Sequence, residues 1–239
     1  MNYLTTKLFP VVVVLLLSPS FSELTAQRRK APAGGKIAVV IDERLAAVRS
    51  TPDVSGVLIR RVGRGRLVAV RTAKRSSDGT VFFLVNLSAR THGWIQREAL
   101  VAPWRAGDDQ RLLRVIRSSN EFDRVMRARI FLDYFSQSPA RPEVLQLLAA
   151  AAEEVAPKLS REASRRVGED APARSYYLNY SGLDRYNRQG VRFVFDREAR
   201  QLHYDGAAWR EIVRRYPRSV QATEARKQLA RLAELMSTQ

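Results

Sequence analysis

The sequence predicts an α+β protein with two folded domains, a small β-barrel at residues 36–104 and a helical domain at residues 107–239. The first observation is a series of short segments rich in β-branched and aromatic residues, separated by turn-forming residues, which is typical of an all-β domain. The second is that helical periodicity replaces these segments after residue 106. The chain has 239 residues, of which 45% are hydrophobic, and this is enough for a packed core.

Residues 1–26 are expected to be a secretory signal peptide. Lys7 precedes an apolar run at residues 8–17, and small and polar residues follow, which is the layout of such a leader. The run is shorter than the ~20 apolar residues that a membrane-spanning helix needs. We therefore expect export to the periplasm or the exterior, with cleavage after Ser22 or Ala26 and no membrane span after cleavage. A retained membrane anchor is the alternative.

The formal net charge is +17 and comes mostly from arginine. Because arginine binds carboxylates and phosphates well, this charge indicates an anionic partner; the alternative is that it serves solubility alone. Nucleic acid is not expected as the partner, since an exported protein seldom meets it. The chain has no cysteine, which excludes disulfides, a thiol nucleophile and lipid attachment at a cysteine.

Five segments are expected to form the barrel, after a flexible linker at residues 27–35 that is basic and contains Pro and Gly. They are KIAVVI, GVLIRRV, RLVAVRT, TVFFLVNL and HGWIQ, with turns at STPDVSG, GRG and SSDG. The third and fourth segments carry apolar residues on both alternating faces, as expected where a barrel interior is packed and its outside meets another domain.

The order of motifs in this region resembles the bacterial SH3-like (SH3b) domain family of envelope proteins over about 65 residues. The matching positions are Ala47, Val48, Arg49, Pro52, Gly65, Val68, Val70, Phe82, Val85, Gly93, Trp94 and Ile95. The family usually has Trp where Phe82 stands, and the connection NLSART is longer than expected. The resemblance implies a small barrel that recognises a peptide or cell-wall material.

Arg49, Phe82 and Trp94 are the candidate ligand-binding residues of this domain. Trp94 is expected either to fill one end of the barrel or to form a surface platform for a ligand. Arg49 is expected either in a structural salt bridge or at a ligand carboxylate, because its guanidinium can donate two parallel hydrogen bonds.

Three helical segments are expected at the start of the second domain. The first is DQRLLRVIRS, and the second is SSNEFDRVMRARIFLDYFSQ, with Ser119 or Asn120 as the N-cap. The third is an Ala- and Leu-rich segment that opens near Pro142. It is expected to be interrupted at Pro157, because proline has no N–H group to donate within a helix.

The chain matches itself at an offset of about 81 residues, which indicates an internal repeat. The shift aligns RIFLDYFSQSPARPEVLQLLAAAAE with REIVRRYPRSVQATEARKQLARLAE, so that Phe135 meets Tyr216. The later copy resembles the tetratricopeptide-like repeats of bacterial envelope proteins at Trp209, Tyr216, Pro217, Ser219, Ala222, Ala225 and Leu229. The resemblance implies paired helices that mediate protein interaction, with Trp209 and Tyr216 packed between hairpins.

A tyrosine-rich segment between the two copies is the candidate binding surface of the helical domain. Its candidate residues are Tyr176, Tyr177, Tyr180, Arg185 and Tyr186, since Tyr and Arg contribute strongly to binding interfaces. A small hairpin is expected after this segment, near residues 191–204.

No catalytic, metal or cofactor site is predicted. His92 and His203 lie far apart and outside any zinc-binding motif, and the sequence has no GxSxG, P-loop or dinucleotide motif. A wall-cleaving glycosidase needs two carboxyl groups, and the acidic residues considered for that role lie in no recognisable setting. They are Glu98, Glu153, Glu154, Asp196 and Glu198.

These observations predict an exported, non-catalytic adaptor or binding protein of the cell envelope. Its barrel is expected to recognise a cell-wall peptide or another anionic envelope component, and its helical domain a protein partner. The alternative is a peptidoglycan hydrolase whose carboxylate site no motif reveals.

Overall fold

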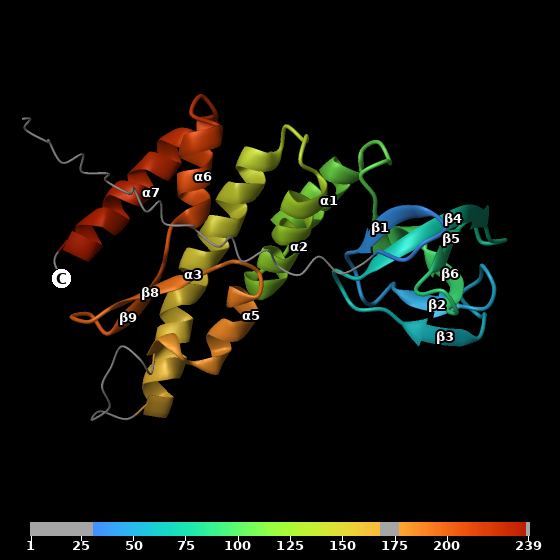
Figure 1. Cartoon of the computed structure of the whole chain (residues 1–239), viewed down its shortest axis with the longest axis horizontal. Helices are drawn as coiled ribbons and strands as arrows, with labels where there is room; N and C mark the ends of the chain where they lie inside the picture. Colours follow the sequence, from blue (N-terminus) through green and yellow to red (C-terminus); the bar gives the residue numbers. More distant parts are fainter. Residues whose placement is uncertain (1–30, 168–176, 238–239) are drawn as a thin grey trace, which may run out of the picture.

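The computed structural model describes residues 31–167 and 177–237. The chain is an α+β protein in which an antiparallel sheet is followed by a mainly helical region, and the two lie next to each other along the long axis (Figure 1). Within the described ranges, no helix is both long and apolar enough to cross a membrane.

Seven strands form the N-terminal sheet. They are β1 (Lys36–Val40), β2 (Ala47–Arg49), β3 (Leu58–Arg61), β4 (Leu67–Arg75), β5 (Val81–Asn86), β6 (His92–Gln96) and β7 (Leu100–Val101), and the 3-10 turn η1 (Arg97–Ala99) joins the last two. Their order is β3-β2-β6-β5-β4-β1-β7, and neighbouring strands run antiparallel.

The sheet is open, so the closed barrel expected from the sequence is not confirmed. The end strands β3 and β7 do not pair with each other. All four residues of β3 are exposed and β7 has only two residues, which leaves too little strand to join the ends.

The open sheet nevertheless curves around a core of its own. Its members include Val40, Val48, Val68, Val70, Phe83, Val85, Ile95 and Leu100. The cluster joins β2, next to one end of the strand order, to β7 at the other end. The sheet is therefore strongly curved, and its second face points outwards.

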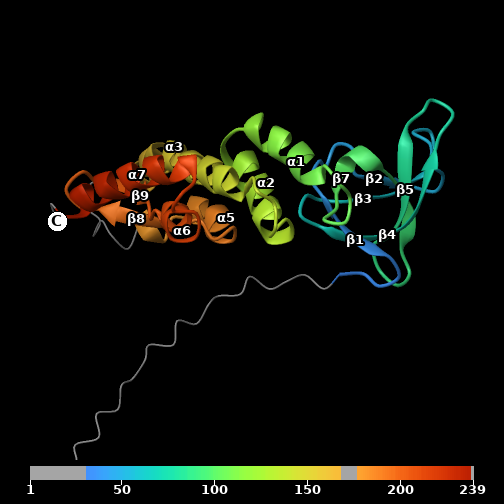
Figure 2. The same ribbon diagram turned by 90° about the horizontal axis from the view of Figure 1, so that it is seen from above.

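The helical region begins with α1 (Asp108–Arg117), α2 (Glu121–Tyr134) and α3 (Arg141–Val167), and after a gap in the described residues it continues with η2 (Ser181–Leu183) and α5 (Asp184–Asn187). The strands β8 (Phe193–Asp196) and β9 (Gln201–Tyr204) pair antiparallel where the sequence predicted a small hairpin. The region ends with α6 (Ala207–Arg215) and α7 (Val220–Ser237). Figure 2 shows α6, α7 and the β8–β9 hairpin gathered around α3.

The expected interruption at Pro157 is wrong, because α3 continues through this residue as one helix. Proline removes one backbone hydrogen bond, but Val155, Ala156 and Leu159 on either side of it are buried in the core. We infer that this packing keeps the helix continuous.

The two hairpins α2–α3 and α6–α7 contain the same turn, 81 residues apart. In each, three backbone N–H groups, spaced three residues apart, donate to carbonyls three or four residues earlier. The pairs are Phe135 to Phe131, Ser138 to Phe135 and Arg141 to Ser138 in the first turn, and Tyr216 to Ile212, Ser219 to Tyr216 and Ala222 to Ser219 in the second, at 2.8–3.3 Å. The internal match in the sequence therefore corresponds to a repeated local structure.

The sheet and the helices share one core. Ile41 and Leu67 of the sheet region belong to the same buried cluster as Leu112 and Ile116 of α1. Because apolar side chains from both regions leave water together, neither region is expected to be fully packed without the other.

A buried carboxylate fixes the joint between the two regions. Asp108, at the start of α1, accepts the backbone N–H of Ala102 at 2.8 Å and Nη2 of Arg105 at 2.6 Å. Nearby, Nη1 of Arg111 donates to the carbonyl of Glu98 at 3.0 Å. Polar contacts therefore tie the end of the sheet to the first helix.

Candidate functional site

The outer face of the sheet carries a row of three cross-strand neighbours. Arg49 on β2 lies opposite Trp94 on β6, and Trp94 lies opposite Leu84 on β5. All three side chains are half-buried. Their strand neighbours Val85 and Ile95 belong to the sheet core, and because successive side chains in a strand point to opposite faces, the row points outwards.

A pocket of about 380 Å³ lies on this face. Its lining residues are Ser50, Ile59, Arg71, Leu84, His92, Gly93 and Trp94. The pairing of β4 with β5 shifts register between Val70 and Thr72, so Arg71 occupies a bulge, and bulges redirect side chains. Apolar side chains thus surround one guanidinium and one imidazole, a combination typical of ligand sites. We call this pocket the sheet pocket.

Gly93 permits the close approach of strands beneath the sheet pocket. A Cβ atom at this position would lie 2.6 Å from Cγ1 of Val48 and 2.7 Å from the carbonyl oxygen of Arg49. No larger residue fits without moving β2, so the glycine keeps β2 and β6 paired and Trp94 in place.

Arg49 has a structural contact. Its Nη1 donates to the carbonyl of Gly56 at 2.8 Å, across the loop between β2 and β3. In the described part of the chain this side chain forms no salt bridge. Its structural contact is therefore a hydrogen bond to the backbone and not the salt bridge that was expected as one of two possibilities. Trp94 is on the outer face and does not close one end of a barrel.

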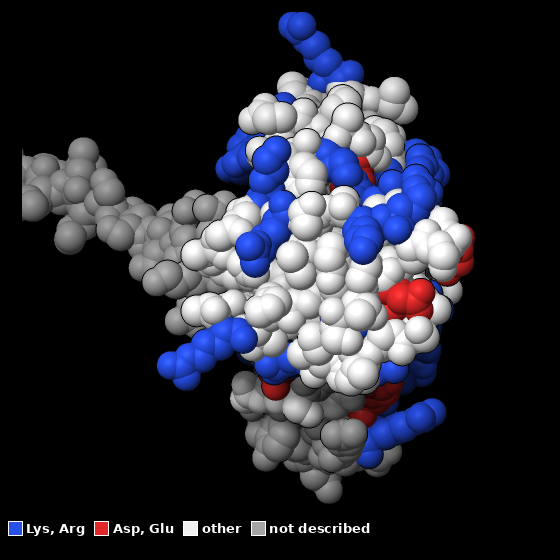
Figure 3. Space-filling view, turned by 90° about the vertical axis from the view of Figure 1, so that its right-hand side faces the viewer, with Lys and Arg blue, Asp and Glu red and all other residues white. Residues whose placement is uncertain are grey.

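The sheet region is strongly basic, and several of its arginine side chains have no partner. Residues 36–104 contain 12 Lys and Arg but only 5 Asp and Glu, and Figure 3 shows basic residues spread over this end of the molecule. Arg60, Arg61 and Arg66 line a shallower hollow of about 180 Å³ beside Leu87. Within the described ranges, the side chains of Arg60, Arg61 and Arg71 have no hydrogen-bond or ion-pair partner and are exposed, so their charges face solvent.

An apolar edge adjoins the basic surface. Val54, Val57, Leu58 and Ile59 are 49%, 73%, 45% and 46% exposed and make up four of the seven exposed large hydrophobic residues in the described chain. They lie in or just before β3, the edge strand of the sheet. Exposed apolar patches of this kind mark interaction sites.

Phe82 is not a surface residue, contrary to the expectation for a ligand contact. Its side chain is fully buried, at 0% exposure. Phe82 lies opposite Lys74 and Gln96 in the sheet. A ligand therefore cannot touch it in this conformation.

The tyrosine-rich segment is largely a packing element. Tyr177 and Tyr186 are 1% and 0% exposed and belong to the helical core, contrary to the expectation of a binding surface. Burial raises the pKa of the Tyr186 hydroxyl. The half-buried Tyr180 donates to Oε2 of Glu162 at 2.8 Å, and Tyr176 lies outside the described residues.

Among the described candidate residues of this segment, only Arg185 is exposed. Its guanidinium lies over the rings of Phe122 and Tyr186, 5.2 Å and 4.9 Å from their centroids. The Arg185 guanidinium thus already makes cation–π contacts with aromatic rings of the protein itself. The structure therefore does not bring these residues together as a groove.

The acidic residues do not assemble into a catalytic pair in the described part of the chain. Glu98 pairs with Arg97 and Glu154 lies 3.9 Å from Arg124. Asp196 accepts two backbone N–H groups in the β8–β9 turn, from Glu198 and Ala199. No group of three or more metal-ligating residues occurs in the described ranges.

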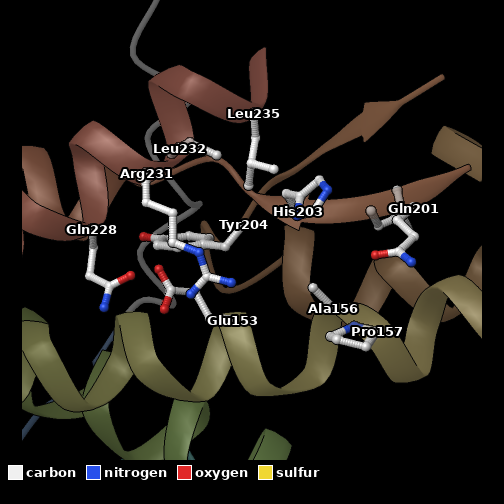
Figure 4. Close-up of a pocket in the computed structure, with 11 residues that line it drawn as sticks. Glu153, Ala156, Pro157, Gln201, His203, Tyr204, Gln228, Arg231, Leu232 and Leu235 are labelled. Carbon is white, nitrogen blue, oxygen red and sulfur yellow. The ribbon is translucent and has the colours of Figure 1, made fainter. Parts of the chain in front are cut away.

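Glu153 is the only carboxylate that lines a second pocket, between α3, β9 and α7 (Figure 4). Nε1 of Trp209 donates to its Oε1 at 2.7 Å. Burial raises the pKa of the Glu153 carboxyl, while the hydrogen bond from Trp209 opposes this shift. His203 also lines this pocket, and its Nε2 lies 3.8 Å from Asp196.

The sequence did not single out several residues of these pockets. Ile59, Arg71 and Leu84 meet Trp94 only because β3, β4 and β5 curve together with β6. The signal available in the sequence was the alternation around Trp94, which places Leu84 on the same face once the register is known.

Comparisons with known proteins identify no relative. No family model matches the chain. No curated protein and no solved structure matches it either.

Proposed function

We propose that the protein is an exported, non-catalytic protein of the cell envelope that binds an anionic wall peptide or polymer through the outer face of its sheet. The observation that carries the proposal is the sheet pocket, where Trp94 and Leu84 meet Arg71 at an exposed surface. The helical region acts as the adaptor that engages a protein partner.

The sheet pocket offers two kinds of attraction to such a ligand. Trp94, Leu84 and Ile59 can remove an apolar group from water, and the Arg71 guanidinium can donate to a carboxylate or phosphate. Because Arg60, Arg61 and Arg71 have no partners within the described chain, an anion binds without breaking existing ion pairs. Charge of this kind also accelerates association.

Two resemblances support an envelope function. Residues around Gly93 and Trp94 resemble bacterial SH3-like domains, and the curved antiparallel sheet is compatible with that family although its ends are unpaired. The second helical hairpin resembles tetratricopeptide-like repeats, and the repeated turn at Phe135 and Tyr216 is compatible with that resemblance. The leader at residues 1–26 accounts for export.

The test is a pull-down of the chain from Gln27 onward on insoluble peptidoglycan, at low and at high salt, with soluble products assayed in parallel. We expect saturable binding that salt weakens, because arginine supplies part of the attraction, and no release of products. Trp94→Ala is expected to lower the affinity about tenfold or more, as is usual for a central aromatic contact.

Trp104→Ala is the matched control. Trp104 is an exposed tryptophan of the same region that donates to the carbonyl of Ile37 and lies outside the sheet pocket, so its loss is expected to leave binding unchanged. Absence of binding, or equal loss in the two variants, would contradict the proposal. Secretion of a reporter fused behind residues 1–30 tests export separately.

The alternative function, a wall hydrolase, has one observation in its favour. Burial raises the pKa of Glu153, which suits a general acid, although no second carboxylate lines its pocket. Release of soluble fragments that Glu153→Gln abolishes would establish this alternative in place of the binding function.

A further inference from the structure

The pocket beside Glu153 is small and lies between three elements. It measures about 230 Å³, which is below the roughly 300–1,000 Å³ of sites for drug-sized ligands. Its walls come from α3, β9 and α7 (Figure 4). A ligand that fits must therefore be small.

Two opposite charges enter this pocket without pairing. Glu153 reaches in from α3 and Arg231 from α7, and Figure 4 shows both side chains directed into the space between the helices. The nearby Arg231 lowers the pKa of Glu153 through its charge, but the two groups form no ion pair. Arg231 has no hydrogen-bond or ion-pair partner in the described chain. The pocket thus contains a carboxylate and a guanidinium that do not form an ion pair with each other.

Trp209 fixes the position of the Glu153 carboxylate. Its indole N–H donates to Oε1, and the indole itself is 2% exposed, so one carboxylate oxygen is anchored and the other is left for a ligand. The backbone carbonyl of Glu153 also lacks its usual helical donor, because the residue four positions later is Pro157. The second carboxylate oxygen of Glu153 is therefore available to a donor group.

The remaining walls combine the polar residues Gln201, His203, Tyr204 and Gln228 with an apolar part. The apolar part consists of Ala156, Pro157, Leu202, Leu232 and Leu235. The same apolar surroundings withdraw water from the Glu153 carboxylate, which is why burial raises its pKa. A cationic ligand group would compensate for this lost hydration.

We propose that this pocket binds a small zwitterionic amino acid with an apolar side chain. The ligand ammonium lies against Glu153, the ligand carboxylate receives hydrogen bonds from Arg231, and the apolar side chain lies among the leucines. A group bearing only one of the two charges leaves the other pocket residue unsatisfied, so both charges are required for full affinity.

The experiment compares three ligands of one shape by titration calorimetry on the chain from Gln27 onward. Leucine carries both charges, 3-methylbutylamine lacks the carboxylate, and 4-methylpentanoate lacks the ammonium. We expect leucine to bind saturably and about tenfold or more tightly than either analogue. Equal affinity for leucine and 3-methylbutylamine, or no heat from leucine, would overturn the proposal.

Four variants locate the binding. Glu153→Gln, which keeps an acceptor for Trp209, and Arg231→Gln are each expected to weaken leucine binding about tenfold or more. Glu154→Gln and Lys227→Gln remove the same charges from α3 and α7 outside the pocket and are expected to leave it unchanged. Loss of binding in these controls as well would show a general charge effect and overturn the assignment.

This site is independent of the proposed wall binding. Trp94→Ala is expected to weaken peptidoglycan binding and to leave leucine binding intact, since Trp94 lies in the sheet and not in this pocket. A negative result for peptidoglycan binding therefore does not bear on leucine binding, and a negative result for leucine binding does not bear on peptidoglycan binding.

Discussion

Arg49 and Trp94 lie directly opposite each other on β2 and β6, although they are far apart in the sequence. The Arg49 guanidinium spans the β2–β3 loop to the carbonyl of Gly56, while the Trp94 indole lines the sheet pocket. The two residues therefore have different roles: the arginine holds the β2–β3 loop, and the tryptophan provides contact surface in the pocket.

This division predicts different effects for two arginine substitutions. Arg49→Ala removes the hydrogen bond to Gly56 and is expected to lower the free energy of unfolding by about 1 kcal/mol. Arg71→Ala removes an exposed guanidinium without a partner and is expected to change stability by less than about 0.5 kcal/mol while weakening peptidoglycan binding. Urea denaturation and the pull-down measure the two effects, and equal stabilities of the two variants would argue against the assigned roles.

Phe82 is predicted to matter for stability and not for contact with a ligand. Phe82→Ala deletes a fully buried ring and is expected to lower the free energy of unfolding by about 3–5 kcal/mol. Trp94→Ala is expected to lower the free energy of unfolding by less, because Trp94 is only half-buried. Denaturant titration of both variants checks the order, and a larger loss at Trp94 would contradict it.

Asp108 is predicted to hold the sheet to the helices. Asp108→Asn leaves the guanidinium groups of Arg105 and Arg111 without their anionic partner, and we expect a loss of about 2–3 kcal/mol. Asp184→Asn, at an exposed position, serves as the control and should cost less than about 0.5 kcal/mol. Urea titration of both variants measures the two losses. Similar losses for Asp108→Asn and Asp184→Asn would contradict the prediction.

Tyr216 is predicted to link the two helical hairpins. Its hydroxyl accepts Nε of the buried Arg141 at 3.1 Å, and Arg141 also donates to the carbonyl of Leu132 at 2.8 Å. Tyr216→Phe removes only the first of these bonds and is expected to cost about 1 kcal/mol. That loss corresponds to a decrease of the thermal midpoint by about 2–4 °C. An unchanged midpoint would refute the link.

Glu153 is predicted to make stability depend on pH. Because burial raises its pKa above the ordinary value of 4.5, the folded protein holds this proton more tightly than the unfolded chain does. The contribution to the free energy of unfolding is therefore complete below pH 4.5 and is lost as pH rises through the folded-state pKa.

The Gln variant isolates this effect. Glu153→Gln cannot ionise but still accepts from Trp209, so its stability relative to the unsubstituted protein should increase across that pH window and then level off. Urea denaturation at several pH values from about 4 to about 8 measures the difference. A difference that does not change with pH would show that the carboxyl is not perturbed.

Sequence patterns were informative where structure depends on neighbours along the chain. The strand segments, the change to helices near residue 106 and the repeated turn at Phe135 and Tyr216 follow from side-chain periodicity and turn chemistry. These are short-range properties, so the sequence contains them directly. Composition likewise fixed the excess of arginine and the absence of cysteine.

Long-range packing decided the rest. Whether β3 and β7 meet, whether Pro157 breaks α3, and whether Tyr177, Tyr186 and Phe82 are buried all depend on residues distant in sequence. The sheet pocket and the pocket at Glu153 each combine side chains from at least three elements. The sequence by itself determined which elements form, and only the tertiary structure decided which side chains remain exposed, because burial is set by contacts between elements rather than by order along the chain.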